Sequence, residues 1–202
     1  MIIIKHRINS ISLLQETSTN LGIEIDIRSY QDKLILNHEP YLDGEKIENF
    51  LKYYNHQFLI LNVKEEGLEK RLIELMKLFK IKNYFFLDQS FPFLIKTTKS
   101  GENRCAVRLS EYESINTVLS LSNVVKWVWV DYFTKLPLDY KKYLKLRELK
   151  FKICLVSPEL QGHNKAQLVK LQKELINNKI HINAVCTKYP DLWNHSNLFI
   201  ST

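Results

Sequence analysis

The carboxylates of Glu24 and Asp26 stand two residues apart in the stretch Gly22–Arg28, in which apolar and charged residues alternate. This period of two predicts a β-strand with three isoleucines on one face and the charged side chains on the other. Because a strand rises about 3.3 Å per residue, the two carboxylates lie side by side. Such crowding is unfavourable unless a cation or another partner lies between them. The stretch therefore indicates either a divalent-cation site or the solvated charged face of an edge strand.

Further polar residues stand where predicted strands end. His6-Arg7 follows the first apolar run, His38 follows a strand-like piece after the second, and Asn62 and Lys64 end the third. Two imidazoles can act as general base and general acid on opposite sides of a phosphorus atom. A cation held by the two carboxylates would neutralise the non-bridging oxygens, and Arg7 and Lys64 would share that charge. These residue types suit the cleavage of a phosphodiester.

Three later apolar runs end in Asp88, Asp131 and Ser157-Pro158-Glu159. Glu159 is a candidate substrate-binding residue at the end of the seventh run. Capping of the following helix explains Asp88 and Asp131 equally well, and Glu159 is also compatible with a solvated loop.

The elements that must position these residues are short apolar runs separated by segments with helical periodicity. Four segments have apolar residues spaced three and four apart: Gly67–Lys80, Glu111–Leu121, Asp139–Leu149 and Lys165–Asn178. Strands that alternate with helices predict parallel βαβ units. Eight units of about 25 residues fit a small (β/α)8 TIM barrel, with an open doubly wound sheet as the alternative. The eight runs are Ile2–Lys5, Ile23–Ile27, Phe58–Val63, Tyr84–Leu87, Cys105–Leu109, Val124–Val130, Phe151–Val156 and Ala184–Cys186.

A barrel favours the functional interpretation of the first stretch. The outward face of a barrel strand packs on helices, so the isoleucines face outward and Glu24, Asp26 and Arg28 face the interior or its rim. Charges in that position need partners. The carboxyl ends of barrel strands also carry the active sites of this fold. The segment Lys33–His38 is expected to form a small hairpin above the barrel.

Composition limits the remaining possibilities. The 202 residues suit a single domain, 1–202, and the net charge of +7 favours anionic partners. No arginine-rich run or zinc spacing indicates nucleic acid as a partner. Cys105, Cys154 and Cys186 are far apart in sequence, which favours buried free thiols in a reducing compartment. We find no apolar run long enough for stable membrane insertion and expect a cytoplasmic protein.

The motifs resemble, in order and almost end to end, those of the glycerophosphodiester phosphodiesterases, which share a barrel with phosphatidylinositol-specific phospholipases C. The family has His-Arg after strand one, Glu-x-Asp on strand two, a Lys-Asp-Gly-like hairpin that leads to a second histidine, and Glu-x-Lys on strand three. It then has a Ser-Phe pair and a Thr-Asp-x-Pro-like turn. The corresponding residues here are His6-Arg7, Glu24-Ile25-Asp26, Gln31-Asp32-Lys33 with His38, Asn62-Val63-Lys64, Ser90-Phe91 and Thr187–Pro190.

The resemblance implies a metal-assisted phosphodiesterase acting on a small glycerophosphodiester or polyol-phosphate diester. His6 and His38 would be the acid–base pair, and Arg7 and Lys64 would bind the phosphate. Glu24 and Asp26 would hold one Mg²⁺ or Ca²⁺ ion. Asn62 stands at the third metal-binding position, where its amide oxygen can still bind a hard cation.

Several departures from the family pattern support other hypotheses. Ile8 replaces a glycine, Glu39 an aspartate, Asn62 a carboxylate and Lys188 an acidic residue, and the motif Pro-Glu-Asn-Thr is absent. A second hypothesis is therefore a barrel that binds phosphorylated ligands without turnover. A third is a peripheral membrane lipase, based on the positive charge and on Trp127-Val128-Trp129, which buried packing on a barrel strand also explains.

Overall fold

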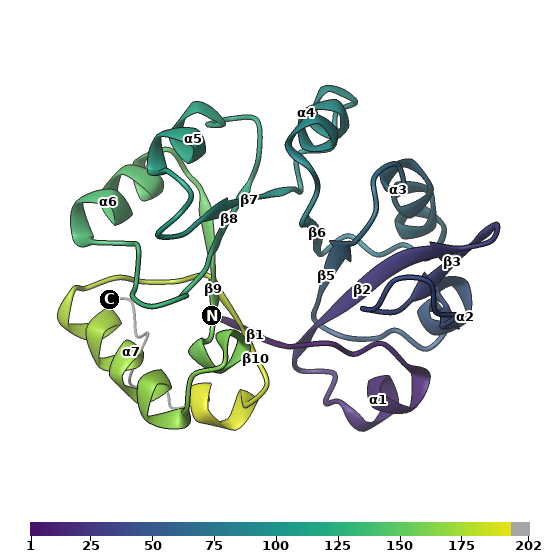
Figure 1. Cartoon of the computed structure of the whole chain (residues 1–202), viewed down its shortest axis with the longest axis horizontal. Helices are drawn as coiled ribbons and strands as arrows, with labels where there is room; N and C mark the ends of the chain where they lie inside the picture. The colour runs from purple at the N-terminus through teal and green to yellow at the C-terminus, as the bar shows by residue number, and fades with distance from the viewer. Residues whose placement is uncertain (195–202) are drawn as a thin grey trace. The chain divides into compact units, whose positions relative to one another are not determined.

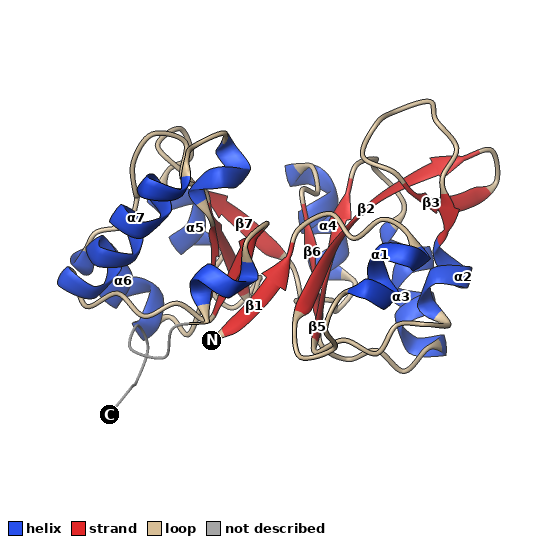
Figure 2. Ribbon diagram, turned by 90° about the horizontal axis from the view of Figure 1, so that it is seen from below, coloured by secondary structure: helices blue, strands red, loops and turns tan. Residues whose placement is uncertain are grey.

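The computed structural model describes residues 1–194, which form two compact units. The N-terminal unit contains residues 5–105, and the C-terminal unit contains Met1–Ile4 with the residues from 106 onward. Each unit combines parallel strands with helices (Figures 1 and 2). The organisation of residues 1–202 as one domain stays a prediction.

The N-terminal unit is built on the long strand β2 (Gly22–Tyr30), which pairs in parallel with β5 (Phe58–Val63). Strand β5 pairs in parallel with β6 (Tyr84–Leu87), and Phe86 of β6 forms a single parallel bridge with Cys105. The helices of this unit are α1 (Ile11–Glu16), α2 (Ile47–Leu51), α3 (Glu69–Leu78) and α4 (Phe91–Lys99).

The predicted hairpin is confirmed on the other edge of β2. Strand β3 (Lys33–Leu36) pairs antiparallel with the end of β2, and the two-residue strand β4 (Glu45–Lys46) pairs with β3. Position 44, just before β4, has room only for glycine, because a Cβ there would lie 2.4 Å from the carbonyl oxygen of Leu36. This close approach fixes the loop that carries His38.

The C-terminal unit contains four parallel strands in sequence order, with β1 beside β10. Ile2, at the start of β1 (Ile2–Lys5), donates its N–H to Asn183 O at 2.8 Å. Helices α5, α6 and α7 lie along one face of these strands (Figure 1). The elements are β7 (Ala106–Leu109), α5 (Ile115–Ser120), β8 (Trp127–Val130), α6 (Tyr140–Glu148), β9 (Lys152–Val156), α7 (Lys165–Asn177) and β10 (Ala184–Thr187), with short 3-10 helices at Pro158–Gln161 and Pro190–Trp193.

Burial agrees with several sequence predictions. The three cysteines are buried free thiols, as their apolar surroundings predict. Trp127 and Trp129 are buried, so the tryptophan pair belongs to the core and does not form a membrane anchor. Within residues 1–194, no helix has both the length and the apolar character that crossing a membrane requires.

Candidate functional site

The acidic pair on β2 is the centre of a polar cluster in the N-terminal unit. Glu24 and Asp26 are completely buried, as expected if the charged face of the strand points away from solvent. The parallel register places Asn62 of β5 directly beside Asp26. The Asn62 side-chain nitrogen donates to Glu24 Oε1 at 2.8 Å and to Asp26 Oδ1 at 3.1 Å. The three residues predicted as metal ligands therefore meet.

The loop after β1 supplies further partners of this pair. The backbone N–H of Arg7 donates to Glu24 Oε2 at 2.7 Å, and His6 Nε2 lies 3.8 Å from the same oxygen. Arg7 adopts a φ of 56°, in the left-handed region that residues with a Cβ rarely occupy. Its guanidinium Nε lies 3.7 Å from Asp26 Oδ2. His6 and Arg7 therefore both lie against the acidic pair.

Asn9 is a residue of this cluster that the sequence analysis did not identify. Its side-chain nitrogen donates to Asp26 Oδ2 at 2.9 Å, and its side-chain oxygen accepts the backbone N–H of Asp26 at 2.9 Å. The only available signal was its position three residues after His6, in the loop that follows the first strand. These two bonds hold the loop that contains Asn9 on strand β2.

Lys64 lies just beyond β5 and bridges two carboxylates. Its Nζ is 3.4 Å from Asp26 Oδ1 and 3.3 Å from Asp88 Oδ2. Asp88 follows β6 with a φ of 61°, and the residue that caps α4 is Ser90. The capping role considered for Asp88 is therefore wrong, and its carboxylate instead holds the Lys64 ammonium group beside the acidic pair.

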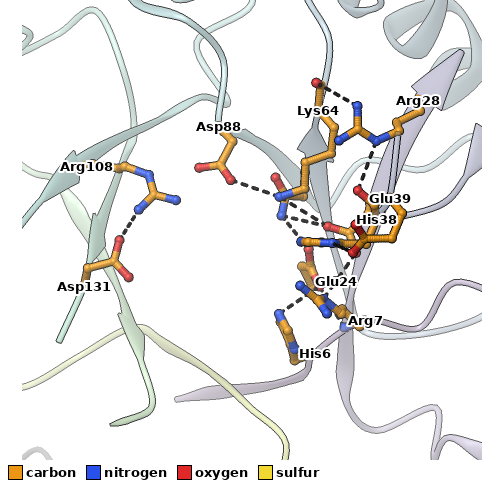
Figure 3. A network of polar contacts seen from close by, with 12 residues as sticks. His6, Arg7, Glu24, Arg28, His38, Glu39, Lys64, Asp88, Arg108 and Asp131 are labelled. Carbon is orange, nitrogen blue, oxygen red and sulfur yellow. Dashed lines mark hydrogen bonds and ion pairs between the residues drawn. The ribbon is translucent and has the colours of Figure 1, made fainter. Parts of the chain in front are cut away.

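His38 lies on the hairpin, at the rim of the same unit. Its carbonyl oxygen accepts from Arg28 Nε at 3.0 Å, and Arg28 Nη1 also donates to Lys64 O at 3.4 Å (Figure 3). The imidazole Nδ1 is 2.6 Å from Glu39 Oε1, and the side chain is 36% exposed. The pKa of Glu39 is lowered, and the largest cause is the hydrogen bond between its carboxylate and the His38 imidazole. Arg28 thus ties the histidine-bearing loop to β2 and β5.

Burial dominates the electrostatics of the acidic pair. Loss of hydration, followed by repulsion from Asp26, raises the pKa of Glu24 to about 8. The hydrogen bonds from Asn62 and from the backbone of Arg7 act in the opposite direction. At neutral pH Glu24 therefore keeps its proton, unless a cation replaces it.

The donor atoms of this cluster fit a hard divalent cation. Two carboxylates and one amide offer oxygen ligands, which Mg²⁺ and Ca²⁺ prefer. Asn62 Oδ1 is buried and has no hydrogen-bond partner among the described residues. Rotation of the amide by about 180° would turn this oxygen toward the carboxylates. Within residues 1–194, no group of three or more histidine, cysteine or acidic side chains is placed to bind a metal. The amide of Asn62 is a further oxygen donor beside the two carboxylates.

Glu159 lies in the C-terminal unit, where its carboxylate has partners of its own. It is buried and accepts hydrogen bonds from the hydroxyls of Ser157 and Thr187 and from the backbone N–H of Lys188. These bonds join the ends of β9 and β10, so the solvated-loop interpretation is wrong. The substrate-binding role of Glu159 stays a prediction.

Comparison with known proteins identifies structural relatives. No protein-family model matches the sequence, and no curated protein matches it. Three solved structures are similar over most of their length. A protein proposed to be a glycerophosphoryl diester phosphodiesterase from Agrobacterium tumefaciens is 11% identical, with a TM-score of 0.69 and 95% of each chain covered.

The other two structures give nearly the same result. A glycerophosphodiester phosphodiesterase from A. tumefaciens is 12% identical, with a TM-score of 0.68 over 96% of this chain and 97% of that one. A glycerophosphoryl diester phosphodiesterase from Parabacteroides distasonis is 12% identical, with a TM-score of 0.67 over 94% and 83%. The chain shares their fold, which confirms the predicted α/β class and (β/α)8 barrel architecture.

Proposed function

We propose that this protein is a metal-assisted phosphodiesterase that cleaves a small glycerophosphodiester or a related polyol-phosphate diester. The observation that carries the proposal is the meeting of Glu24, Asp26 and Asn62 with His6, Arg7 and Lys64 in one unit. The fold that the chain shares with glycerophosphodiester phosphodiesterases supports the same activity.

The acidic pair and Asn62 would hold one Mg²⁺ or Ca²⁺ ion. When bound, the ion would neutralise charge on the non-bridging phosphate oxygens. Lys64 and Arg7 provide fixed positive charge beside that position, since Nζ and Nε lie 3.4 Å and 3.7 Å from the oxygens of Asp26. Lys64 and Arg7 would bind the substrate phosphate and stabilise the charge that develops on it in the transition state.

His6 and His38 would exchange protons with the substrate. Glu24 Oε2 lies 3.8 Å from Nε2 of His6, which places this imidazole beside the acidic pair. Glu39 contacts Nδ1 of His38, which leaves Nε2 for the substrate. One imidazole would accept the proton of the attacking hydroxyl or water, and the other would donate a proton to the leaving oxygen.

A panel of glycerophosphodiesters and cyclic phosphodiesters, assayed with Mg²⁺, Ca²⁺ and Mn²⁺, tests the proposal. We expect turnover that His6→Ala and His38→Ala each reduce by about 100-fold or more, in line with general acid–base catalysis. His181→Ala removes an exposed imidazole outside the candidate site and is the matched control. No turnover by the intact protein, or full turnover by either catalytic variant, would contradict the proposal.

The second candidate function is binding of phosphorylated ligands without turnover. It is favoured by the Asn62 amide, which already satisfies both carboxylates with hydrogen bonds. In that case glycerol 3-phosphate would raise the unfolding temperature without being consumed, and calorimetry would detect no divalent-cation binding.

A further inference from the structure

Two of the turns that lead from helix to strand in the C-terminal unit carry a lysine in the left-handed conformation. Lys150 follows α6 with a φ of 60°, and Lys179 follows α7 with a φ of 53°. Glycine is the residue usually found in this left-handed conformation at the end of a helix. A lysine here places a charged side chain on the edge where the next strand begins.

Three more basic residues lie on the same edge of the unit. Lys126 and Lys152 begin neighbouring strands, and Lys126 O accepts the N–H of Lys152 at 2.9 Å. Arg147, in the last turn of α6, accepts the N–H of Lys150 at 3.0 Å. All five side chains are exposed. We refer to Lys126, Arg147, Lys150, Lys152 and Lys179 as the basic edge.

The charge of the basic edge has little local compensation. Among the ion pairs of residues 1–194, none includes a member of the basic edge. In the three sequence stretches that form it, 121–127, 147–152 and 176–183, Glu148 is the single acidic residue. Ile176, one turn before Lys179, exposes half of its apolar side chain. The edge therefore combines at least four net positive charges with an exposed apolar group.

We propose that the basic edge docks on the surface of an anionic phospholipid membrane. Charge complementarity carries this inference. Each lysine or arginine near an anionic lipid surface increases the affinity of the protein for that surface by roughly fivefold. Ile176 adds an apolar side chain that can enter the headgroup region. The interaction is peripheral and needs no inserted helix.

A lipid surface fits the edge better than a nucleic acid does. Single-stranded nucleic acids are bound through exposed aromatic rings on which bases stack. Trp127 and Phe151, the tryptophan and phenylalanine of these stretches, are buried, and Lys152 Nζ lies 5.5 Å from the centre of the Trp127 ring. The basic edge is at the amino-terminal ends of β8 and β9, so docking leaves the carboxyl ends of these strands in water. The inference does not depend on the proposed phosphodiesterase activity.

Vesicle sedimentation with the full chain tests the proposal. The probe is phosphatidylcholine vesicles containing about a third phosphatidylglycerol, at about 0.1 M salt, compared with pure phosphatidylcholine. We expect binding only to the anionic vesicles, with release at about 1 M salt. The double variant Lys150→Gly/Lys179→Gly should bind about 25-fold more weakly, from about fivefold for each lysine.

The variants are chosen so that misfolding does not explain a loss of binding. Glycine relieves the left-handed backbone at both positions, so the double variant should unfold at a higher temperature than the parent protein. The control Lys80→Gly/Lys70→Gln removes two positive charges from the N-terminal unit. It also relaxes one left-handed turn, since Lys80 has a φ of 56°. This control should bind anionic vesicles as the parent protein does. Equal weakening by both pairs, equal binding to neutral vesicles, or binding to duplex DNA without binding to vesicles would overturn the proposal.

Discussion

The side-chain nitrogen of Asn62 lies 2.8 Å from Glu24 Oε1 and donates a hydrogen bond to the carboxylate that the proposed function assigns to a divalent cation. If the protein binds the proposed cation, the amide N–H and the cation compete for the acidic pair. This competition makes the affinity for the cation the property of the site that mutation should change most directly.

The variant Asn62→Asp should bind Mg²⁺ and Ca²⁺ about tenfold more tightly or better, because a third carboxylate replaces a neutral amide of the same shape. Without the cation, the variant should be less stable by about 3 kcal/mol or more, since it loses two buried hydrogen bonds and crowds three acids. Isothermal titration calorimetry and urea unfolding measure the two effects. Asn177→Asp, on the exposed side of α7, should change neither, and unchanged affinity in Asn62→Asp would exclude this residue as a ligand.

The raised pKa of Glu24 predicts how stability depends on pH. The folded protein keeps the proton up to a pH of about 8, whereas the unfolded chain releases it near 4.5. The contribution of Glu24 to the free energy of unfolding is therefore complete below pH 4.5 and falls as the pH rises toward 8, by up to about 5 kcal/mol. Urea unfolding at several pH values, with a chelator present, measures the loss.

The variant Glu24→Gln is the control for this pH dependence, because it cannot ionise. It retains the contribution of His56, whose pKa is lowered by burial and whose effect on stability has the opposite sign. The difference between the two curves therefore isolates Glu24. Saturating Mg²⁺ should restore stability at pH 8 in the parent protein, and parallel curves for parent and variant would refute the prediction.

Strand geometry made part of this site predictable from the sequence. The period of two in β2 was enough to place Glu24 and Asp26 on one buried face, and the order of the strands placed Asn62 beside them. The role of Asn9 was not predictable, because a loop amide has no periodic signal and its two bonds to Asp26 depend on the path of the chain. Helix α1 was missed because its apolar residues, Ile11, Leu13 and Leu14, do not recur over a second turn.

If the proposed function is correct, Lys64 should have opposite effects on the binding of the cation and of the substrate phosphate. Its ammonium group lies 3.4 Å from Asp26 Oδ1, so it repels a bound cation and attracts a phosphate. Lys64→Gln is therefore expected to bind Mg²⁺ several-fold more tightly and to lose about 100-fold in kcat/KM, as a lost phosphate-binding charge implies. Lys64→Arg should retain more of the activity. A decrease in both the affinity for Mg²⁺ and kcat/KM would show that Lys64 acts only on folding.

The hairpin that carries His38 depends on Gly44. In Gly44→Ala the new Cβ would meet the carbonyl oxygen of Leu36 at 2.4 Å, and backbone atoms on both sides would have to move. We expect a loss of about 2 kcal/mol or more in the free energy of unfolding, with faster amide exchange in β3 and β4, because this strain cannot relax through a side chain. Gly101→Ala is the matched control, since its Cβ would meet no atom within 4 Å and only its φ of 95° is unfavourable. The control should lose about 1 kcal/mol and keep slow exchange in the hairpin. Equal exchange rates in the two variants would show that Gly44 does not hold the loop of His38 in place.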